Sequence, residues 1–215
     1  MSLFHQRNAS GPAADPRYIS MALESLDNAT LDVCEGEYLD ISYQERAAVR
    51  VDEIVSVARK HGALYGVSAK LGGIAAAADD EILNALYKFG SALGTAQNLN
   101  IDLQAQWPEE GTERTEVQRG RLQSKKKSIA TAHAIENGTP TTRRRLGEIF
   151  MKRVLDPSDL DEVTIILGET KSRAFAEGKI DELVDEALSA LNRAALPDEQ
   201  QQLLADSAKL IVGTK

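Results

Sequence analysis

The chain has 215 residues and a formal net charge of −8, and 42% of its residues are hydrophobic whereas only 5% are aromatic. Because Ala, Leu, Ile and Val must then fill most of the core, this composition favours packed helices over sheets and predicts an all-α protein. The negative charge argues against nucleic acid as a partner, and a single cysteine, Cys34, excludes an internal disulfide and most zinc sites. No apolar run approaches the roughly 20 residues of a membrane span and no signal-peptide pattern is present, so we expect a cytoplasmic protein.

Helical periodicity of apolar residues runs through almost all of the chain. Residues 1–17 are expected to form a flexible lead-in, and residues 18–215 a single all-helical domain. Cys34 falls in an apolar helical stripe and is predicted to lie in the core. Residues 108–120 are predicted to form a polar loop. The predicted helices span about 18–38, 43–73, 81–106, 121–137, 141–155, 158–177, 179–194 and 197–212.

Small residues recur at helical spacing in two of the predicted helices. A glycine inside a helix costs about 1 kcal/mol relative to alanine, so repeated glycine indicates either close approach of two helices or room for a ligand. Helix packing is the simpler interpretation, and a long apolar ligand channel is the alternative. The residues concerned are Gly62, Ala63, Gly66 and Ala69 in one helix and Gly90, Gly94 and Ala96 in the next.

Three stretches follow one another along the chain: EGEYLDI (residues 35–41), KHGALYGVSAKLGG (residues 60–73) and KFGSALGTAQNLNIDL (residues 88–103). They resemble motifs of the trans-isoprenyl diphosphate synthase, or polyprenyl synthetase, family. RLQSKKKSI (residues 121–129) is similar to that family's aspartate, basic residues and threonine at the mouth of the site, and residues 196–213 resemble its C-terminal helix. The resemblance covers roughly residues 25–213, in the right order.

The resemblance implies an isoprenoid-synthase-like helical bundle around a central cavity. In the family, two aspartate-rich motifs face each other and hold Mg²⁺ ions, which bind the diphosphate of an allylic substrate before condensation with isopentenyl diphosphate. Mg²⁺ takes oxygen ligands and dehydrates reluctantly, so anionic side chains and substrate phosphates must neutralise it. The bundle is expected to be incomplete, because the family's N-terminal third, with the first aspartate-rich motif, has no counterpart in this sequence.

The second aspartate-rich motif is degenerate. Gln97 matches the family's glutamine ahead of that motif, and its three aspartates then correspond to Asn100, Ile101 and Gln104. These positions share one helical face, whereas Asp102 lies well off it. Amide oxygens cannot offset the charge of a metal ion, so we interpret this face as the remains of a metal site. A shifted match would bring Asp102 into the site, but one aspartate still does not hold three ions.

The cationic positions of the family are better preserved. Lys60 matches the lysine that binds the substrate diphosphate, although His61 follows it in place of threonine. Lys126 or Lys127 matches the later basic position. Cationic donors suit a diphosphate, so these lysines and Gln97 are the candidate diphosphate-binding residues. For the run of three lysines at residues 125–127, a solvated surface is the alternative.

Two other acidic stretches resemble an aspartate-rich motif without fitting the site. Asp79-Asp80-Glu81 is predicted to cap the helix that follows it. DELVDE (residues 181–186) places its acids opposite an apolar stripe, so these acids are predicted to face solvent.

Two hypotheses of function follow. In the first, the chain is a prenyltransferase relative of isoprenoid metabolism that binds an allylic or prenyl diphosphate but is inactive alone, because the ligands for Mg²⁺ are lost. In the second, it is a non-catalytic small or regulatory subunit that partners an active synthase, or a helical interaction protein. The family pairs along helices, so a homodimer or a heteromer with a catalytic subunit is expected.

Overall fold

A computed structural model describes residues 15–108 and 111–213. Among these residues every regular element is a helix, which confirms the predicted all-α class, and no helix there is both long and apolar enough to cross a membrane. The predicted lead-in of residues 1–17 falls mostly on residues 1–14, which lie outside the described part. The helices are α1 (Pro16–Gln44), α2 (Val51–Ala75), α3 (Asp80–Gln106), α4 (Glu116–Gln123), α5 (Ile129–Asn137), α6 (Pro140–Met151), α7 (Pro157–Glu169), α8 (Ser172–Arg193) and α9 (Asp198–Val212).

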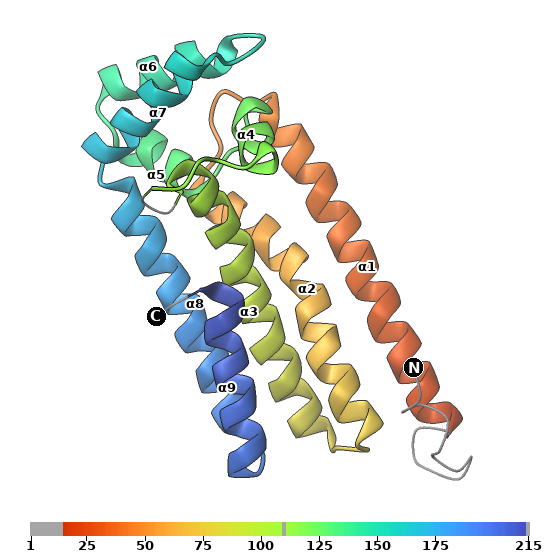
Figure 1. The fold of residues 1–215 in the computed structure, drawn as a ribbon. Coiled ribbons are helices and arrows are strands. Elements are labelled where there is room, and N and C mark those ends of the chain that lie inside the picture. The colour runs from red at the N-terminus through yellow and green to blue at the C-terminus, as the bar shows by residue number, and fades with distance from the viewer. Residues whose placement is uncertain (1–14, 109–110, 214–215) are drawn as a thin grey trace.

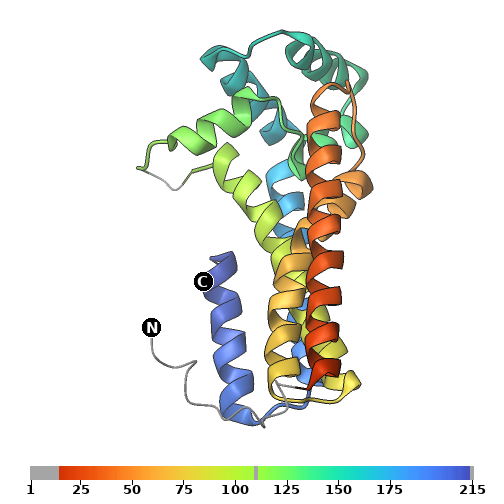
Figure 2. The same cartoon turned by 90° about the vertical axis from the view of Figure 1, so that its right-hand side faces the viewer.

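The long helices form a row with the order α1, α2, α3, α8 (Figure 1). Helix α9 runs back along α3 and α8, and Figure 2 shows it standing apart from α1. The short helices α4 to α7 gather at one end of the row, above the C-terminal ends of α1 and α3. Alanine fills much of the interior, as the scarcity of aromatic residues requires, and Ala96, Ala176, Ala187 and Ala190 are fully buried.

Helices α2 and α3 approach each other closely because glycine lies at their contact. A Cβ atom added at Gly90 would lie 2.3 Å from the Tyr65 carbonyl oxygen, and one at Gly62 would lie 2.5 Å from the Ser91 carbonyl oxygen. Gly94 faces the Tyr65 ring in the same way. Side chains at these positions would push the two helices apart. The small residues therefore serve helix packing, and the space at these glycines is filled by the neighbouring helix.

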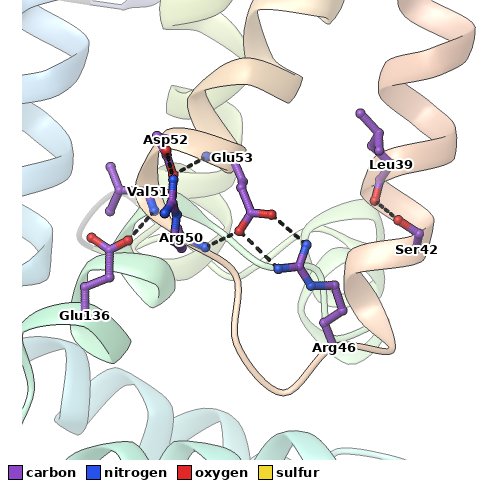
Figure 3. Close-up of polar contacts among 8 residues, drawn as sticks. All are labelled: Leu39, Ser42, Arg46, Arg50, Val51, Asp52, Glu53 and Glu136. Atoms are coloured by element: carbon purple, nitrogen blue, oxygen red, sulfur yellow. Dashed lines mark hydrogen bonds and ion pairs between the residues drawn. The ribbon is translucent and has the colours of Figure 1, made fainter.

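The corner between α1 and α2 is fixed by a network around Glu53 (Figure 3). Its carboxylate accepts hydrogen bonds from Arg46 Nη1 and Nη2, at 2.7 and 3.1 Å, and from the Arg50 backbone N–H at 2.9 Å. The N–H of Val51 donates to Glu136 Oε1 of α5 at 2.9 Å, so the first turn of α2 is tied to the end of α5. These contacts satisfy backbone donors that a helix start leaves without an internal partner.

Helix α1 packs almost entirely on α2, and its other side is exposed. Cys34 is exposed there, so the prediction that it lies in the core is wrong. The apolar periodicity around Cys34 is real, but it follows the outer side of α1 and not the side that meets α2. The exposed apolar side chains on this side, called the outer α1 face below, are Ile19 (47%), Leu23 (57%), Leu26 (43%), Leu31 (68%), Tyr38 (72%) and Ile41 (62%).

Several predicted helix boundaries are wrong. The first helix continues to Gln44 instead of ending near residue 38, the second begins at Val51 instead of residue 43, and the helix expected over residues 141–155 ends at Met151. Two further errors lie at a lysine with positive φ. The helix expected over residues 121–137 is interrupted at Lys125 (φ 60°), so that α4 and α5 are separate and α4 begins inside the expected loop. The helix expected over residues 158–177 ends before Lys171 (φ 54°), and Gly178 lies inside α8. Glycine and asparagine are the usual residues in this backbone region, and lysine gives no signal of it.

The two acidic stretches behave as predicted. Asp79 caps α3, and its Oδ1 accepts a hydrogen bond from the Ile82 N–H at 2.9 Å. In DELVDE the acids are exposed while Leu183 is buried. Neither stretch contributes a residue to the candidate functional site.

Candidate functional site

Four charged side chains meet where the ends of α1 and α3 lie beneath α4. Asp40 comes from α1, Asp102 from α3, Arg121 from α4 and Lys126 from the turn before α5. Lys126 Nζ lies 2.7 Å from Asp40 Oδ2 and 3.5 Å from Asp102 Oδ2. Arg121 Nη1 lies 2.5 Å from Asp102 Oδ1. We call these four residues the ion cluster.

The ion cluster is largely removed from solvent. Asp102 is 7% exposed and Asp40 9%, and the side chain of Lys126 is 12% exposed. Burial raises the pKa of Asp102, and the charges of Lys126 and Arg121 oppose that rise. Two carboxylates and two cations cancel in formal charge, which is the arrangement that buried charges require.

The turn after α4 brings Lys126 into the cluster. Helix α4 ends where the N–H groups of Ser124 and Lys125 donate hydrogen bonds to the carbonyl groups of Gly120 and Leu122, respectively. The positive φ of Lys125 then reverses the chain, and Ser128 caps α5 by accepting a hydrogen bond from the Thr131 N–H at 3.2 Å.

The loop between α3 and α4 is held at the same end of the bundle. Arg114 donates to the carbonyl oxygens of Ala105 and Gln106, at 3.0 and 2.9 Å, and so satisfies carbonyl groups at the end of α3. Arg121 of α4 is thereby positioned above Asp102.

A small cavity of about 20 Å³ adjoins the ion cluster. This volume is about that of one water molecule and far below the several hundred Å³ of an organic ligand site. Its polar lining includes Asp102, Gln106, Lys126 and Thr131.

Lys127 is buried and contacts an aromatic ring instead of a carboxylate of the ion cluster. It is 1% exposed, and its Nζ lies 4.1 Å from the centroid of the Phe150 ring and donates to the Lys125 carbonyl oxygen at 3.2 Å. The pKa of Lys127 is lowered to about 8, chiefly by burial and also by the charge of Lys125, while the charge of Glu45 opposes the shift. Of the two lysines considered for the later basic position, only Lys126 belongs to the ion cluster.

Lys60 lies in a separate group of charges between α1 and α2. Its Nζ contacts Glu35 Oε2 at 2.8 Å and Asp32 Oδ1 at 3.3 Å, and these acids raise the pKa of Lys60. Lys60 does not line the cavity beside Lys126. The structure therefore places the two candidate cations in different groups, each with its own carboxylate partners.

The face that carries the degenerate metal-motif positions points toward α9. Asn100 Nδ2 donates to the Val212 carbonyl oxygen at 2.6 Å, and Gln104 is exposed beside a groove of about 610 Å³ between α3, α8 and α9. Ile101 is half-buried, and the buried Oε1 atom of Gln97 has no hydrogen-bond partner among the described residues. Asn100 and Gln104 therefore lie on a different side of α3 from Asp102.

Three members of the ion cluster were not among the candidate site residues. Asp102 lies off the face of Gln97 and Asn100, so the match to the family motif does not mark it. The available signals were the aspartate that ends the stretch EGEYLD, which is Asp40, and the arginine that opens RLQSKKKSI, which is Arg121. Both stretches belong to the motifs that carry the family resemblance.

Comparisons with known proteins place the chain in a family. The polyprenyl synthetase family model matches residues 9–167. The chain is 28% identical over 200 residues to a geranylfarnesyl diphosphate synthase of Natronomonas pharaonis, covering 89% of this chain and 54% of that protein. It is 25% identical over 202 residues to a (2E,6E)-farnesyl diphosphate synthase of Mycobacterium bovis, covering 92% of this chain and 56% of that protein.

Solved structures show the same fold. The crystal structure of a geranylgeranyl pyrophosphate synthetase from Pyrococcus horikoshii has a TM-score of 0.79 and 27% sequence identity, over 93% of this chain and 60% of that chain. A geranylgeranyl pyrophosphate synthase from Corynebacterium glutamicum, complexed with isoprenyl diphosphate and magnesium, has a TM-score of 0.82 at 21% identity, over 93% and 57% of the two chains.

This chain belongs to the polyprenyl synthetase family, and it has the helical fold of geranylgeranyl pyrophosphate synthases. It spans somewhat more than half the length of the relatives it matches.

The side chains that the structure describes do not fit the magnesium that the family implies. Among the described residues, no group of three or more His, Cys, Asp or Glu side chains could hold a metal ion. The two buried acids of the ion cluster, Asp40 and Asp102, are already bonded to Lys126 and Arg121. A cation that binds between these two carboxylates would have to displace the ammonium group of Lys126, which contacts both of them.

Proposed function

We propose that this chain is a polyprenyl-synthetase-family protein of isoprenoid metabolism, located in the cytoplasm, that does not catalyse prenyl transfer on its own. The supporting observation is the state of Asp102, which is the only acid in the C-terminal half of α3 and is bonded to Arg121 and Lys126. Ionisation of an allylic diphosphate needs positive charge placed where the departing pyrophosphate develops its negative charge. No free carboxylate of α3 is left to hold Mg²⁺ there.

The same pairing argues for weak binding of a prenyl diphosphate. Lys60 is neutralised by Glu35 and Asp32, and Lys126 by Asp40 and Asp102. A diphosphate would have to replace carboxylates that already bind these cations, so the electrostatic gain would be small. Titration calorimetry with a short allylic diphosphate and Mg²⁺ is expected to show weak binding at most, and a Lys60→Ala variant is expected to weaken any signal.

The test of catalysis is a condensation assay with the purified chain, Mg²⁺, isopentenyl diphosphate and a short allylic diphosphate. We expect no product above the enzyme-free background. An active synthase of the family, assayed in parallel, is the positive control. Turnover by the unmodified chain above that background would show that the proposal is wrong.

A second function is favoured by the outer α1 face, where six large apolar side chains are 43–72% exposed. Exposed apolar patches of this kind are typical of protein–protein interfaces. We propose that this face pairs with a second copy of the chain or with a catalytic synthase subunit, so that the chain acts as a non-catalytic subunit.

Sedimentation of wild-type protein and of a Leu31→Glu variant tests the pairing. We expect a wild-type dimer that the variant converts to monomer. Leu210→Glu is the matched control, because Leu210 is also an exposed leucine (83%, against 68% for Leu31) and lies on α9. A wild-type monomer that also fails to bind an active synthase subunit would exclude this function.

A further inference from the structure

The ammonium group of Lys126 lies between two carboxylates that come from different helices. It is 2.7 Å from Asp40 Oδ2 of α1 and 3.5 Å from Asp102 Oδ2 of α3. The second oxygen of Asp102 is bonded to Arg121 of α4 at 2.5 Å. One cationic atom thus joins α1 to α3, and a second joins α3 to α4.

These carboxylates need a cation because they are buried. Removing one partner of a buried ion pair leaves an uncompensated charge, which is strongly destabilising. Lys60 provides a contrast in burial. It also contacts two acids, Asp32 and Glu35, but their side chains are 44% and 59% exposed. Water can solvate those acids if the lysine is removed. It cannot solvate Asp102 in the same way.

We propose that Lys126 and Arg121 fill the place of a divalent cation between Asp40 and Asp102, so that the fold of this chain is independent of Mg²⁺. The proposal extends the proposed function, since it states what takes the place of the metal. It also predicts a conversion: when the ammonium group is removed, the two carboxylates will accept a cation from solution.

The wild-type protein gives the first test. Its thermal midpoint should be the same, within about 1 °C, in EDTA and in millimolar MgCl₂ at matched ionic strength. Calorimetry with MgCl₂ alone should show no saturable binding. A rise in the midpoint with Mg²⁺, absent from an Asp102→Asn variant, would overturn the proposal, because it would show that the cluster already binds the ion.

A Lys126→Ala variant gives the second test. Its midpoint in EDTA should fall by about 6 °C or more, the loss expected from breaking a buried pair in a chain of this length. Millimolar Mg²⁺ or Ca²⁺ should restore part of that loss. Propylammonium, which matches the atoms that the substitution removes, should do so as well, whereas Na⁺ at equal ionic strength should not.

Two matched variants separate the cluster from general salt effects. Lys126→Ala combined with Asp102→Asn should lose the response to divalent cations, and Lys60→Ala should show none. If Lys126→Ala does not fold in EDTA, its refolded yield with and without Mg²⁺ is the measurement. No recovery by any cation would overturn the proposal. The condensation assay tests the proposed function separately from these stability measurements. If the fold is independent of Mg²⁺ but the chain shows turnover, only the proposed function is rejected.

Discussion

Gly90 is the position at which one added methyl group should cost the most. Its Cβ in a Gly90→Ala variant would lie 2.3 Å from the Tyr65 carbonyl oxygen, 2.7 Å from the Tyr65 carbonyl carbon and 2.9 Å from the Gly66 Cα. All three are backbone atoms of α2, so no side chain can rotate to relieve the contact. An ordinary van der Waals distance begins at 3.4 Å, and α2 and α3 would have to separate locally by about 1 Å.

The expected magnitude combines two opposed effects. Overpacking of a well-packed core costs about 1–3 kcal/mol, and a backbone contact belongs at the upper end of that range. Alanine regains about 1 kcal/mol in helix propensity over glycine. The net loss in the free energy of unfolding should be about 2 kcal/mol, which corresponds to a fall of about 4–8 °C in the thermal midpoint.

Gly178→Ala is the matched control. Gly178 also lies inside a long helix, α8, but its added Cβ would meet nothing within 4 Å. Only the propensity effect remains, so this variant should be more stable than wild type by about 0.5–1 kcal/mol. Urea unfolding followed by far-ultraviolet circular dichroism measures both variants. A Gly90→Ala protein as stable as Gly178→Ala would refute the close approach of α2 and α3.

Three further predictions concern single side chains. Lys127→Met should raise the free energy of unfolding at pH 7 by about 1–3 kcal/mol, because folding lowers the pKa of Lys127 to about 8. Above pH 8 the unfolded chain keeps a proton on Lys127 that the folded chain has lost. The free energy of unfolding of the wild type should therefore rise between pH 8 and pH 10, and that of the variant should lack this rise. The same pH dependence of the two proteins in urea unfolding would contradict the prediction. Hydrogen bonds from Arg46 lower the pKa of Glu53 below 4.5. The stability that Glu53 contributes is therefore present above pH 4.5 and lost as the pH falls through its folded pKa. A Glu53→Gln variant should be about 1 kcal/mol less stable than wild type at pH 7, and this difference should shrink in acid. Cys34 should react with a thiol reagent under native conditions in the Leu31→Glu variant, which is expected to be monomeric. Reaction only in denaturant would show that the fold of the single chain covers this thiol.

The fold was predictable where the sequence carries a local signal. Asp79 marks the start of α3 by its capping carboxylate, and Gly62 and Gly90 indicate the close contact of α2 with α3. The ends before Lys125 and Lys171 were not predictable, because positive φ at lysine depends on tertiary contacts and not on an intrinsic preference.

The ion cluster was only partly predictable. Helical geometry gives the angle between Asp102 and Asn100 on α3, but it does not say which neighbouring helix each side meets. The structure answers that question: Asn100 meets α9 and Asp102 meets Arg121 of α4. The helical face that carries Gln97 and Asn100 therefore does not include Asp102, the acid that is bonded to Arg121. Lys126 was identified through the family motif, but its partners come from helices far apart in the chain.

The placement of α1 at the edge of the row has a consequence for local unfolding. Since α1 is held mainly by α2, it can detach as one cooperative unit while the contacts among α2, α3 and α8 persist. Amide hydrogens of α1 should then exchange together and earlier than those of α3, and limited proteolysis should begin in α1 or in the connection at residues 45–50. The Lys126–Asp40 contact must break when α1 detaches, so removing it should speed exchange along the whole helix.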